Sequence, residues 1–324
     1  MRDSSDPNPA IAAAPSATPL YVVVAMLTFR RPDCLDRALP LLAEQAGELS
    51  PPATIVIVDN DPAGGARGQV EQWAAQRVRY VHEPRPGIAA ARNRALTEGY
   101  SLDADALVFI DDDELPSKQW LSSLVDAWAR WKCAAVAGPV VARFEQQVDP
   151  WIMASQAFDR RMHATGDTVS GAATHNLLLD LQSVRQLDLR FDERLGLTGG
   201  EDTMFSHQLI DRGGVIRWCD EAEVIEPVPS VRLTRRWVLR RAYRAGTSWS
   251  RMELALARTP RRTLERRLVL AARGVVKLTG GAGLWLAGLA TRNVARQARG
   301  AGRAASYAGL LAGAFGLSLR EYRR

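Results

Sequence analysis

The sequence predicts an α/β fold built on a mostly parallel sheet, with a basic helical region following it. Apolar runs rich in β-forming residues indicate buried strands at residues 21–27 (YVVVAML), 54–58 (TIVIV) and 106–110 (ALVFI). Segments with the apolar spacing of helices lie between these strands, at residues 35–46 and 88–98. Because strand and helix alternate four times within about 110 residues, we expect parallel βαβ units.

Shorter elements complete this alternation and then become harder to read after Pro150. Each is inferred from a brief apolar run or a short helical spacing. The expected helices are residues 70–76, 121–131 and 202–212, and the expected strands are residues 78–81, 134–141, 176–179 and 215–218.

Charge is distributed unevenly along the 324 residues. Residues 1–229 carry 21 basic and 33 acidic side chains, a net charge of −12, whereas residues 230–324 carry 21 basic and 3 acidic ones, a net charge of +18. The overall value of +6 therefore hides an acidic body and a basic tail. With 47% apolar residues, the body can bury a sizeable core.

Three regions follow from these patterns. Residues 1–19 are rich in Ala, Pro, Ser and Asp, do not have the pattern of a signal peptide, and are expected to form a flexible tail. Residues 20–230 are expected to form the α/β domain, and residues 231–324 a basic amphipathic helical tail. The three cysteines are widely spaced and odd in number, which favours a reducing compartment over a disulfide framework.

The basic tail is expected to lie on a membrane surface rather than to cross the membrane. Its most apolar stretch, residues 268–290, contains Arg273 and Lys277, and the uncharged part from Leu278 to Thr291 has only fourteen residues. A membrane-spanning helix needs about 20 apolar residues. Amphipathic basic helices instead bind anionic leaflets. The alternative is that the apolar faces of the tail pack on the α/β domain.

Four consecutive carboxylates follow the third long strand: Asp111, Asp112, Asp113 and Glu114. Like charges repel, so such a cluster is costly unless it binds a cation, and carboxylate oxygens suit Mg²⁺ or Mn²⁺. Asp111 and Asp113 are two residues apart and point to one side of extended backbone, with Asp112 pointing away. Ligands bind outside the carboxyl ends of strands in such sheets. The alternative is a solvated acidic turn.

Two further acids lie at the ends of predicted elements. Asp59 follows the second strand and could accept hydrogen bonds from a ribose hydroxyl or a base; the alternative is an ordinary Asx-turn. Asp202, in the segment 199–202 (GGED), stands at the start of a predicted helix and could be a general base. Its alternative is an acid stabilised by the helix dipole.

Together these residues resemble the inverting glycosyltransferases of family 2, which have the GT-A fold. The resemblance covers residues 21–246, so residues 20–230 are expected to be a GT-A catalytic domain. The tail segment 235–246 is similar to bacterial exopolysaccharide glucosyltransferases of the succinoglycan type. Five motifs carry the resemblance in the family order: residues 27–32 (LTFRRP), 58–60 (VDN), 85–93 (RPGIAAARN), 109–113 (FIDDD) and 200–202 (GED).

The resemblance implies a role for each motif. Asp111 and Asp113 match the DxD motif, in which a divalent metal, Mn²⁺ or Mg²⁺, bridges to the donor diphosphate, and Asp202 matches the catalytic base. The other residues assigned to nucleotide-sugar binding come from the same motifs, and for two of them, Arg85 and Arg92, a solvated helix face is the alternative. They are Thr28, Arg30, Asp59, Arg85, Arg92, Asp111 and Asp112.

The sequence departs from the family pattern in two places. Many GT-A enzymes have a third metal ligand, often His, downstream of the base; here Glu226 occupies that segment, and water is the other candidate. The Gln-x-x-Arg-Trp motif of processive synthases is absent, because Leu233 lies three residues before Arg236. A single-addition enzyme is therefore expected. His207 is expected to be turned away by the helix that follows Asp202. The remaining histidines, His82, His163 and His175, have no ligand spacing and are interpreted as structural.

The expected function is inverting transfer from a UDP-sugar to a glycan or lipid-linked acceptor, on the cytoplasmic face of the cell membrane. Residues 144–161, with Trp151, are expected to shape the acceptor pocket. One alternative is a sugar-nucleotide nucleotidyltransferase, but the segment after the first strand has no glycine-rich phosphate loop. The other is a basic module that binds nucleic acid or membrane without catalysis. The tail has few aromatic residues for stacking on bases, so no nucleic-acid partner is expected.

Overall fold

The computed structural model describes residues 20–196, 199–257 and 259–317. The predicted flexible tail, residues 1–19, lies outside these ranges. A sheet of seven strands forms the centre of the body, in the order β3-β2-β1-β4-β8-β6-β9. Its strands are β1 (Val22–Thr28), β2 (Thr54–Asp59), β3 (Val78–His82), β4 (Ala106–Asp111), β6 (Ala135–Ala137), β8 (Asn176–Asp180) and β9 (Ile216–Trp218).

The sheet is mixed, because one strand runs against its neighbours. β1, β2, β3 and β4 are parallel, as the alternation of strands and helices predicts. β8 is antiparallel to both β4 and β6. The register places Leu27 opposite both Val58 and Asp111, and Thr28 opposite Asp59. The carboxyl ends of three strands, with their polar residues, therefore meet at one edge of the sheet.

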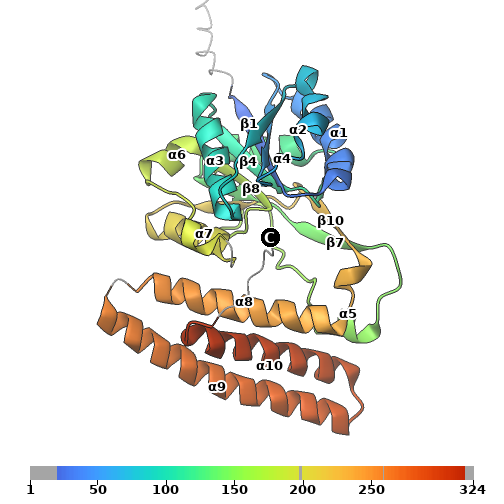
Figure 1. The fold of residues 1–324 in the computed structure, drawn as a ribbon, viewed down its shortest axis with the longest axis vertical. Coiled ribbons are helices and arrows are strands. Elements are labelled where there is room, and N and C mark those ends of the chain that lie inside the picture. The colour runs from blue at the N-terminus through green and yellow to red at the C-terminus, as the bar shows by residue number, and fades with distance from the viewer. Residues whose placement is uncertain (1–19, 197–198, 258, 318–324) are drawn as a thin grey trace, which may run out of the picture.

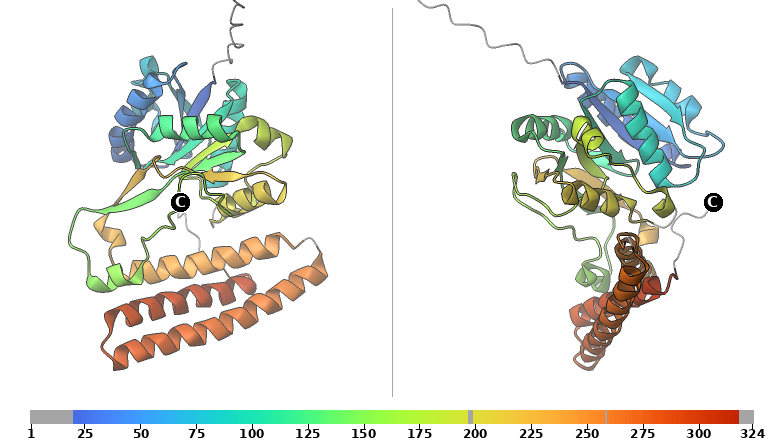
Figure 2. Two further views of the ribbon diagram at one scale, coloured as in Figure 1. Left: turned by 180° about the vertical axis from the view of Figure 1, so that it is seen from behind. Right: turned by 90° about the vertical axis from the view of Figure 1, so that its left-hand side faces the viewer.

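Helices cover both faces of the sheet (Figures 1 and 2). α1 (Pro32–Glu48) and α4 (Trp120–Trp131) pack on one face, where Leu39, Trp120 and Leu124 are fully buried. α3 (Ile88–Ser101), α6 (Leu181–Gln186) and α7 (Glu201–Asp211) pack on the other. The smaller helices are α2 (Arg67–Glu71), α5 (Pro150–Ser155) and the 3₁₀ turns η1 (Ala74–Gln76), η2 (Glu193–Leu195) and η3 (Ser230–Arg232).

The single strand predicted for residues 134–141 is wrong. The chain forms β6, breaks at Gly138-Pro139, and continues as β7 (Val140–Phe144) in a second sheet with the order β5-β10-β7. β5 is Leu115–Pro116 and β10 is Val224–Val228. A Cβ at position 138 would lie 2.6 Å from the Asn176 amide nitrogen, so only glycine fits this crossing. The helix predicted for residues 70–76 likewise divides into α2 and η1.

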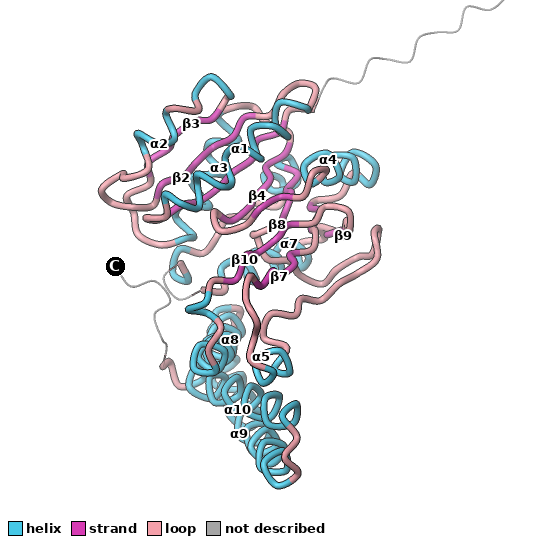
Figure 3. The backbone as a smooth tube through the Cα atoms, turned by 90° about the vertical axis from the view of Figure 1, so that its right-hand side faces the viewer, coloured by secondary structure: helices cyan, strands magenta, loops and turns pink. Residues whose placement is uncertain are grey.

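The basic tail is helical, as predicted, and consists of α8 (Arg235–Ala255), α9 (Pro260–Ala290) and α10 (Val294–Ala314). The side chains of Thr234, Thr259 and Asn293 accept hydrogen bonds from the first turns of these helices. Figures 1 and 3 show α8 lying against the body, with α10 between α8 and α9. The apolar residues of α8 are only partly buried: Val238 and Met252 are covered, whereas Trp249 is exposed.

Small residues allow α10 to pack closely against both neighbouring helices. A Cβ at Gly309 would overlap the carbonyl oxygen of Tyr243, and a Cβ at Gly281 would lie 2.7 Å from the backbone nitrogen of Ala304. The Ser250 hydroxyl donates a hydrogen bond of 2.6 Å to the carbonyl of Leu310. These contacts join α8, α9 and α10 into one unit.

α9 is amphipathic in a way that leaves one face uncovered. Its buried residues include Gly274, Gly281 and Gly288, which face α10. Several apolar side chains on its other faces are exposed, among them Leu268 and Val276. Within the described residues, α9 is the one helix with the length and apolar content to cross a membrane, and 17% of its most apolar window is buried.

Replacement of Gly309 by Ala is expected to lower the free energy of unfolding by about 3 kcal/mol, because the new methyl group has no space between α10 and α8. The matched control is Gly302→Ala on the same helix, where a Cβ would meet nothing within 4 Å. That change should be neutral or stabilising by about 1 kcal/mol. Chemical denaturation measures both values, and equal stability of the two variants would contradict the described helix packing.

Candidate active site

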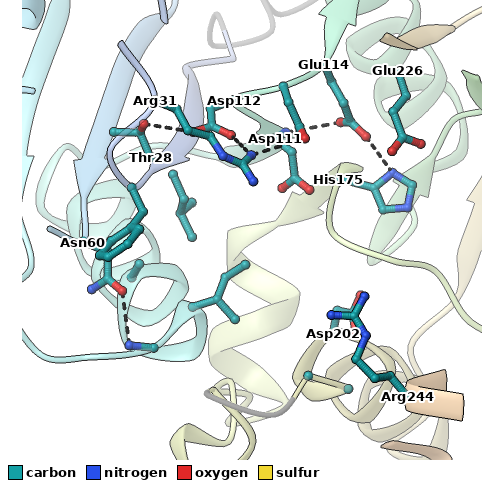
Figure 4. Close-up of a pocket in the computed structure, with 18 of the residues that line it drawn as sticks. Thr28, Arg31, Asn60, Asp111, Asp112, Glu114, His175, Asp202, Glu226 and Arg244 are labelled. Carbon is teal, nitrogen blue, oxygen red and sulfur yellow. Dashed lines mark hydrogen bonds and ion pairs between the residues drawn. The ribbon is translucent and has the colours of Figure 1, made fainter. Parts of the chain in front are cut away.

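A cavity of about 680 Å³ opens at the carboxyl ends of β1, β2 and β4. β10 lines the cavity beside the acidic run that follows β4, and the walls opposite the strand ends come from the first turn of α7 and from α8. Figure 4 shows Asp111 and Asp202 on different walls of this cavity. The register of the parallel strands therefore brings together residues that are far apart in the sequence.

Two of the four consecutive carboxylates are buried and have partners within the protein. Asp112 accepts a hydrogen bond of 2.9 Å from the Thr28 hydroxyl and one of 2.7 Å from the Arg31 guanidinium. Glu114 lies 3.3 Å from the His175 ring nitrogen Nδ1. Burial raises the pKa of Asp112 to about 6 and that of Glu114 to about 8. Burial stabilises the protonated forms of both acids, whereas the contacts with Thr28, Arg31 and His175 stabilise the ionised forms.

His175 is one of the residues whose position the sequence did not indicate. It was interpreted as structural, but its ring lines the cavity beside Glu114, on the side away from Asp111 and close to Glu226 (Figure 4). Burial lowers the pKa of His175, but the negative charges of Glu114 and Asp111 outweigh this effect and raise it. No spacing in the sequence links residues 114 and 175, because the pairing of β4 with β8 brings them together.

The other two carboxylates face the cavity. Asp113 forms an ion pair with Arg31 at 3.2 Å and accepts a hydrogen bond of 2.8 Å from Arg232. Within residues 20–196, 199–257 and 259–317, the side chain of Asp111 has no hydrogen bond or ion pair. Burial raises the pKa of Asp111, and the negative charges of Asp113 and Asp202 raise it further. Asp111 is therefore the acid of this cluster that could still gain a cation.

Asp202 occupies the first turn of α7, after Gly199 and Gly200, whose φ angles are 80° and 95°. These left-handed conformations favour glycine and start the helix at the cavity wall. The Asp202 carboxylate accepts a hydrogen bond of 2.6 Å from the backbone nitrogen of Thr203. The neighbouring Glu201 points inward and forms a buried ion pair with Arg92. That pair anchors α3 to the start of α7.

Four residues assigned to nucleotide-sugar binding do not line the cavity. Arg92 is buried against Glu201, which excludes the solvated face that was its alternative. Arg85 pairs with Glu83 at 2.8 Å and with Glu193, and Arg30 pairs with Asp61 at 3.0 Å. The fourth is Asp59.

Asp59 is buried, and its carboxylate accepts hydrogen bonds from the turn that follows β2 and from β3. It accepts hydrogen bonds from the backbone nitrogens of Asp61 and Ala66, both at 2.9 Å, and from the Tyr80 hydroxyl at 3.1 Å. The bond from Asp61 is that of the Asx-turn considered as the alternative. The neighbouring Asn60 lines the cavity and holds the loop at residues 83–87 with three hydrogen bonds.

Glu226, the candidate third metal ligand, lies on β10 and lines the cavity. Its carboxylate accepts from Arg160 at 2.8 Å and from Arg232 at 3.0 Å. Among the residues that the structure describes, no group of three His, Cys, Asp or Glu side chains is arranged to hold a metal ion. His207 packs edge-to-face on Trp249 and does not line the cavity. This agrees with the expectation that the helix turns it away from the site.

Comparison with solved structures defines the fold of the body. The mannosyltransferase PcManGT from Pyrobaculum calidifontis, solved with GDP-Man and Mn²⁺, superposes with a TM-score of 0.56 at 20% identity, over 91% of this chain and 89% of that chain. S. aureus TarS 1-349 with UDP-GlcNAc gives 0.53 at 14% identity, over 86% and 90%. The present chain spans 42% of the longer TarS chain. The body therefore has the GT-A fold of glycosyltransferases.

The sequence comparisons then fix the family. The model for "Glycosyl transferase family 2" matches residues 23–188, and the model for "Glycosyl transferase family group 2" matches residues 106–317. The succinoglycan biosynthesis protein ExoM of Rhizobium meliloti is 32% identical over 92% of this chain and 94% of its own length. The chain belongs to glycosyl transferase family 2 and is a glycosyltransferase related to exopolysaccharide enzymes. The resemblance read from the motifs is thus confirmed, and the nucleotidyltransferase and non-catalytic alternatives are set aside.

Replacement of Asp59 by Ala is expected to lower the free energy of unfolding by about 3 kcal/mol, because it leaves buried donors without an acceptor. Tyr80→Phe removes one of the three hydrogen bonds and should cost about 1 kcal/mol. Urea denaturation measures both. A fully stable Asp59→Ala protein would show that its hydrogen bonds do not hold the turn after β2.

Proposed function

We propose that this enzyme transfers a sugar from a UDP-sugar to a hydroxyl of a glycan or lipid-linked acceptor, with inversion, in the synthesis of a surface polysaccharide. The observation that carries the proposal is the placement of Asp202 on the cavity wall that faces the Asp111–Asp113 segment. The similarity to a succinoglycan biosynthesis protein over 92% of the chain supports the polysaccharide acceptor. The TarS complex with UDP-GlcNAc supports a UDP-sugar, while PcManGT binds GDP-Man.

A divalent cation fits the acidic wall of the cavity. Asp111 faces the cavity without a protein cation of its own in the described ranges, and Asp113 lies on the same wall. Mg²⁺ and Mn²⁺ are commonly held by one or two carboxylates, with substrate phosphates and water completing the shell. Asp111 and Asp113 would hold the ion, which would offset the negative charge that develops on the departing diphosphate. Both carboxylate oxygens of Glu226 are engaged by arginines, so water is a more suitable ligand; in Asp113 the two arginines contact only Oδ2, which leaves Oδ1 for the ion.

Residues of the chain accept the proton, contact the nucleoside and support the cavity walls. Asp202 accepts the proton of the acceptor hydroxyl while that oxygen bonds to the anomeric carbon and the bond to the diphosphate breaks. Thr28 and Asn60 lie where the nucleoside would enter. Asp59 and Arg92 support these walls from behind: Asp59 fixes the turn that carries Asn60, and Arg92 fixes the turn that carries Asp202. A single addition per acceptor remains our expectation, since the motif of processive synthases is absent.

Two variants separate chemistry from donor binding. Asp202→Asn should lower kcat by roughly 10²–10⁴-fold with UDP affinity nearly intact, because the amide cannot accept the proton. Asp113→Ala should abolish metal-dependent UDP binding. The measurements are sugar transfer to a lipid extract from the producing cells and calorimetry of UDP with Mn²⁺. Asp211→Asn, on the exposed end of α7, is the control. Wild-type turnover in Asp202→Asn would remove this residue from the role of base.

We also propose that the tail holds the enzyme on the cytoplasmic surface of an anionic membrane. α9 exposes apolar side chains on the face away from α10, and the start of the helix carries exposed basic residues, including Arg262 and Arg267. Such a helix binds with its axis in the membrane plane, and each basic residue near an anionic leaflet contributes about 1 kcal/mol. This location suits a lipid-linked acceptor.

Liposome flotation tests this placement. The protein should float with vesicles that contain anionic lipid, less so at high salt, and a variant with Leu268→Glu and Val276→Glu should remain at the bottom of the gradient. Both side chains are exposed, with accessibilities of 64% and 69%, so the fold tolerates the change. Absence of flotation at every lipid composition would exclude the surface model and favour a tail that serves the body alone.

A further inference from the structure

The two sides of the cavity differ in charge. The wall formed by the strand ends carries the acidic run after β4. A second wall, called the basic wall, carries four arginines from three separate segments of the chain, and one of them, Arg232, reaches across to Asp113 of the acidic run. They are Arg160, which follows α5, Arg232 in η3, and Arg241 and Arg244 on α8.

Two of these arginines have carboxylate partners. The two oxygens of Glu226 accept from Arg160 and from Arg232, and Arg232 also pairs with Asp113. Arg241 differs from them. In the part of the chain that the structure describes, no carboxylate lies within ion-pair distance of its guanidinium. A cation in a cavity wall without a counter-charge is a site where an anion binds favourably.

Aromatic rings hold Arg241 in this position. Its guanidinium carbon lies 5.3 Å from the ring centre of Trp237 and 5.8 Å from that of Phe158. The two rings stack in parallel, with centres 5.4 Å apart. Burial and the positive charges of Arg160 and the other arginines of this wall lower the pKa of Arg241 to about 10. The position is thus electrostatically unfavourable until negative charge enters the cavity.

The basic wall lies on the side of the general base. Ser248, two turns after Arg241 on α8, also lines the cavity, and a Cβ at Gly200 would lie 3.5 Å from the Ser248 Cβ. α8 therefore abuts the turn that carries Asp202. The donor diphosphate belongs at the strand ends across the cavity.

We propose that Arg241, with Arg160, forms an anion subsite for an acidic group, a carboxylate or phosphate, on the acceptor near the hydroxyl that receives the sugar. This inference rests on the proposed function and adds a substrate class to it: acidic rather than neutral acceptors. Arginine suits either group, because its planar fork of donors matches both geometries. The rival assignment for the same arginines is the diphosphate of the donor.

Anion binding in the presence of donor product separates these two assignments. The full-length enzyme is first saturated with UDP and Mg²⁺, and inorganic phosphate or D-glucuronate is then titrated, with D-glucose as the neutral probe. We expect one or both anions to bind and glucose not to bind. Arg241→Gln should weaken anion binding roughly tenfold or more, equivalent to about 1.4 kcal/mol, with UDP affinity within about twofold of wild type.

The matched control is Arg240→Gln, which removes the same charge from the exposed face of α8 and should leave anion binding unchanged. Tighter binding of phosphate than of glucuronate would assign a phosphate group to the acceptor, and the reverse a uronic acid. The inference is overturned if no anion binds beside UDP, if Arg241→Gln binds anions like wild type, or if this variant loses UDP affinity instead. Failure of the wild type to bind UDP at all would instead reject the proposed function.

Discussion

The structure depends on how the chain accommodates four adjacent carboxylates at the end of a buried strand. The negative charge of each acid is compensated in a different way. Asp112 is held by Thr28 and Arg31, and Glu114 by His175. Asp113 is shared by two arginines, and the side chain of Asp111 is left to the cavity. Because these partners come from the end of β1, the start of α1 and the segment before β8, compensation of the acids also fixes the walls of the site.

Local sequence patterns were sufficient to predict those strands whose apolar residues alone identify them. β1, β2 and β4 are fully or almost fully buried, so their apolar runs identify them without knowledge of their neighbours. The prediction of one strand at residues 134–141 was wrong because contacts with distant parts of the chain cause the break between β6 and β7. Gly138 must pass the Asn176 amide and the backbone of Ala222, and neither contact is visible in the residues around it.

The site shows the same division between local and distant information. The acids after β4 were found because charge density is a local property. His175 was missed because its partner is sixty-one residues earlier in the sequence, and strand pairing alone brings the two together. Arg241 belongs to an arginine-rich segment in which sequence spacing does not tell which guanidinium faces the cavity. For Asp59 the family motif indicated a ligand contact, whereas its carboxylate accepts hydrogen bonds from the backbone of the turn that it begins and from Tyr80 of β3.

The close packing of α8 against α10 changes how truncated forms of this enzyme should be understood. α8 supplies side chains to the cavity on one side and is interlocked with α10 through Gly246 and Gly309 on the other. Removing α9 and α10 would expose that interlocked surface and disturb the helix that carries Arg241. Loss of activity in such a shortened protein would therefore not report on membrane attachment. Among the described residues, α9 and α10 contribute none to the cavity lining, but α10 braces the helix that does, so chimaeras that exchange the C-terminal helices should keep the residues of α10 that contact α8.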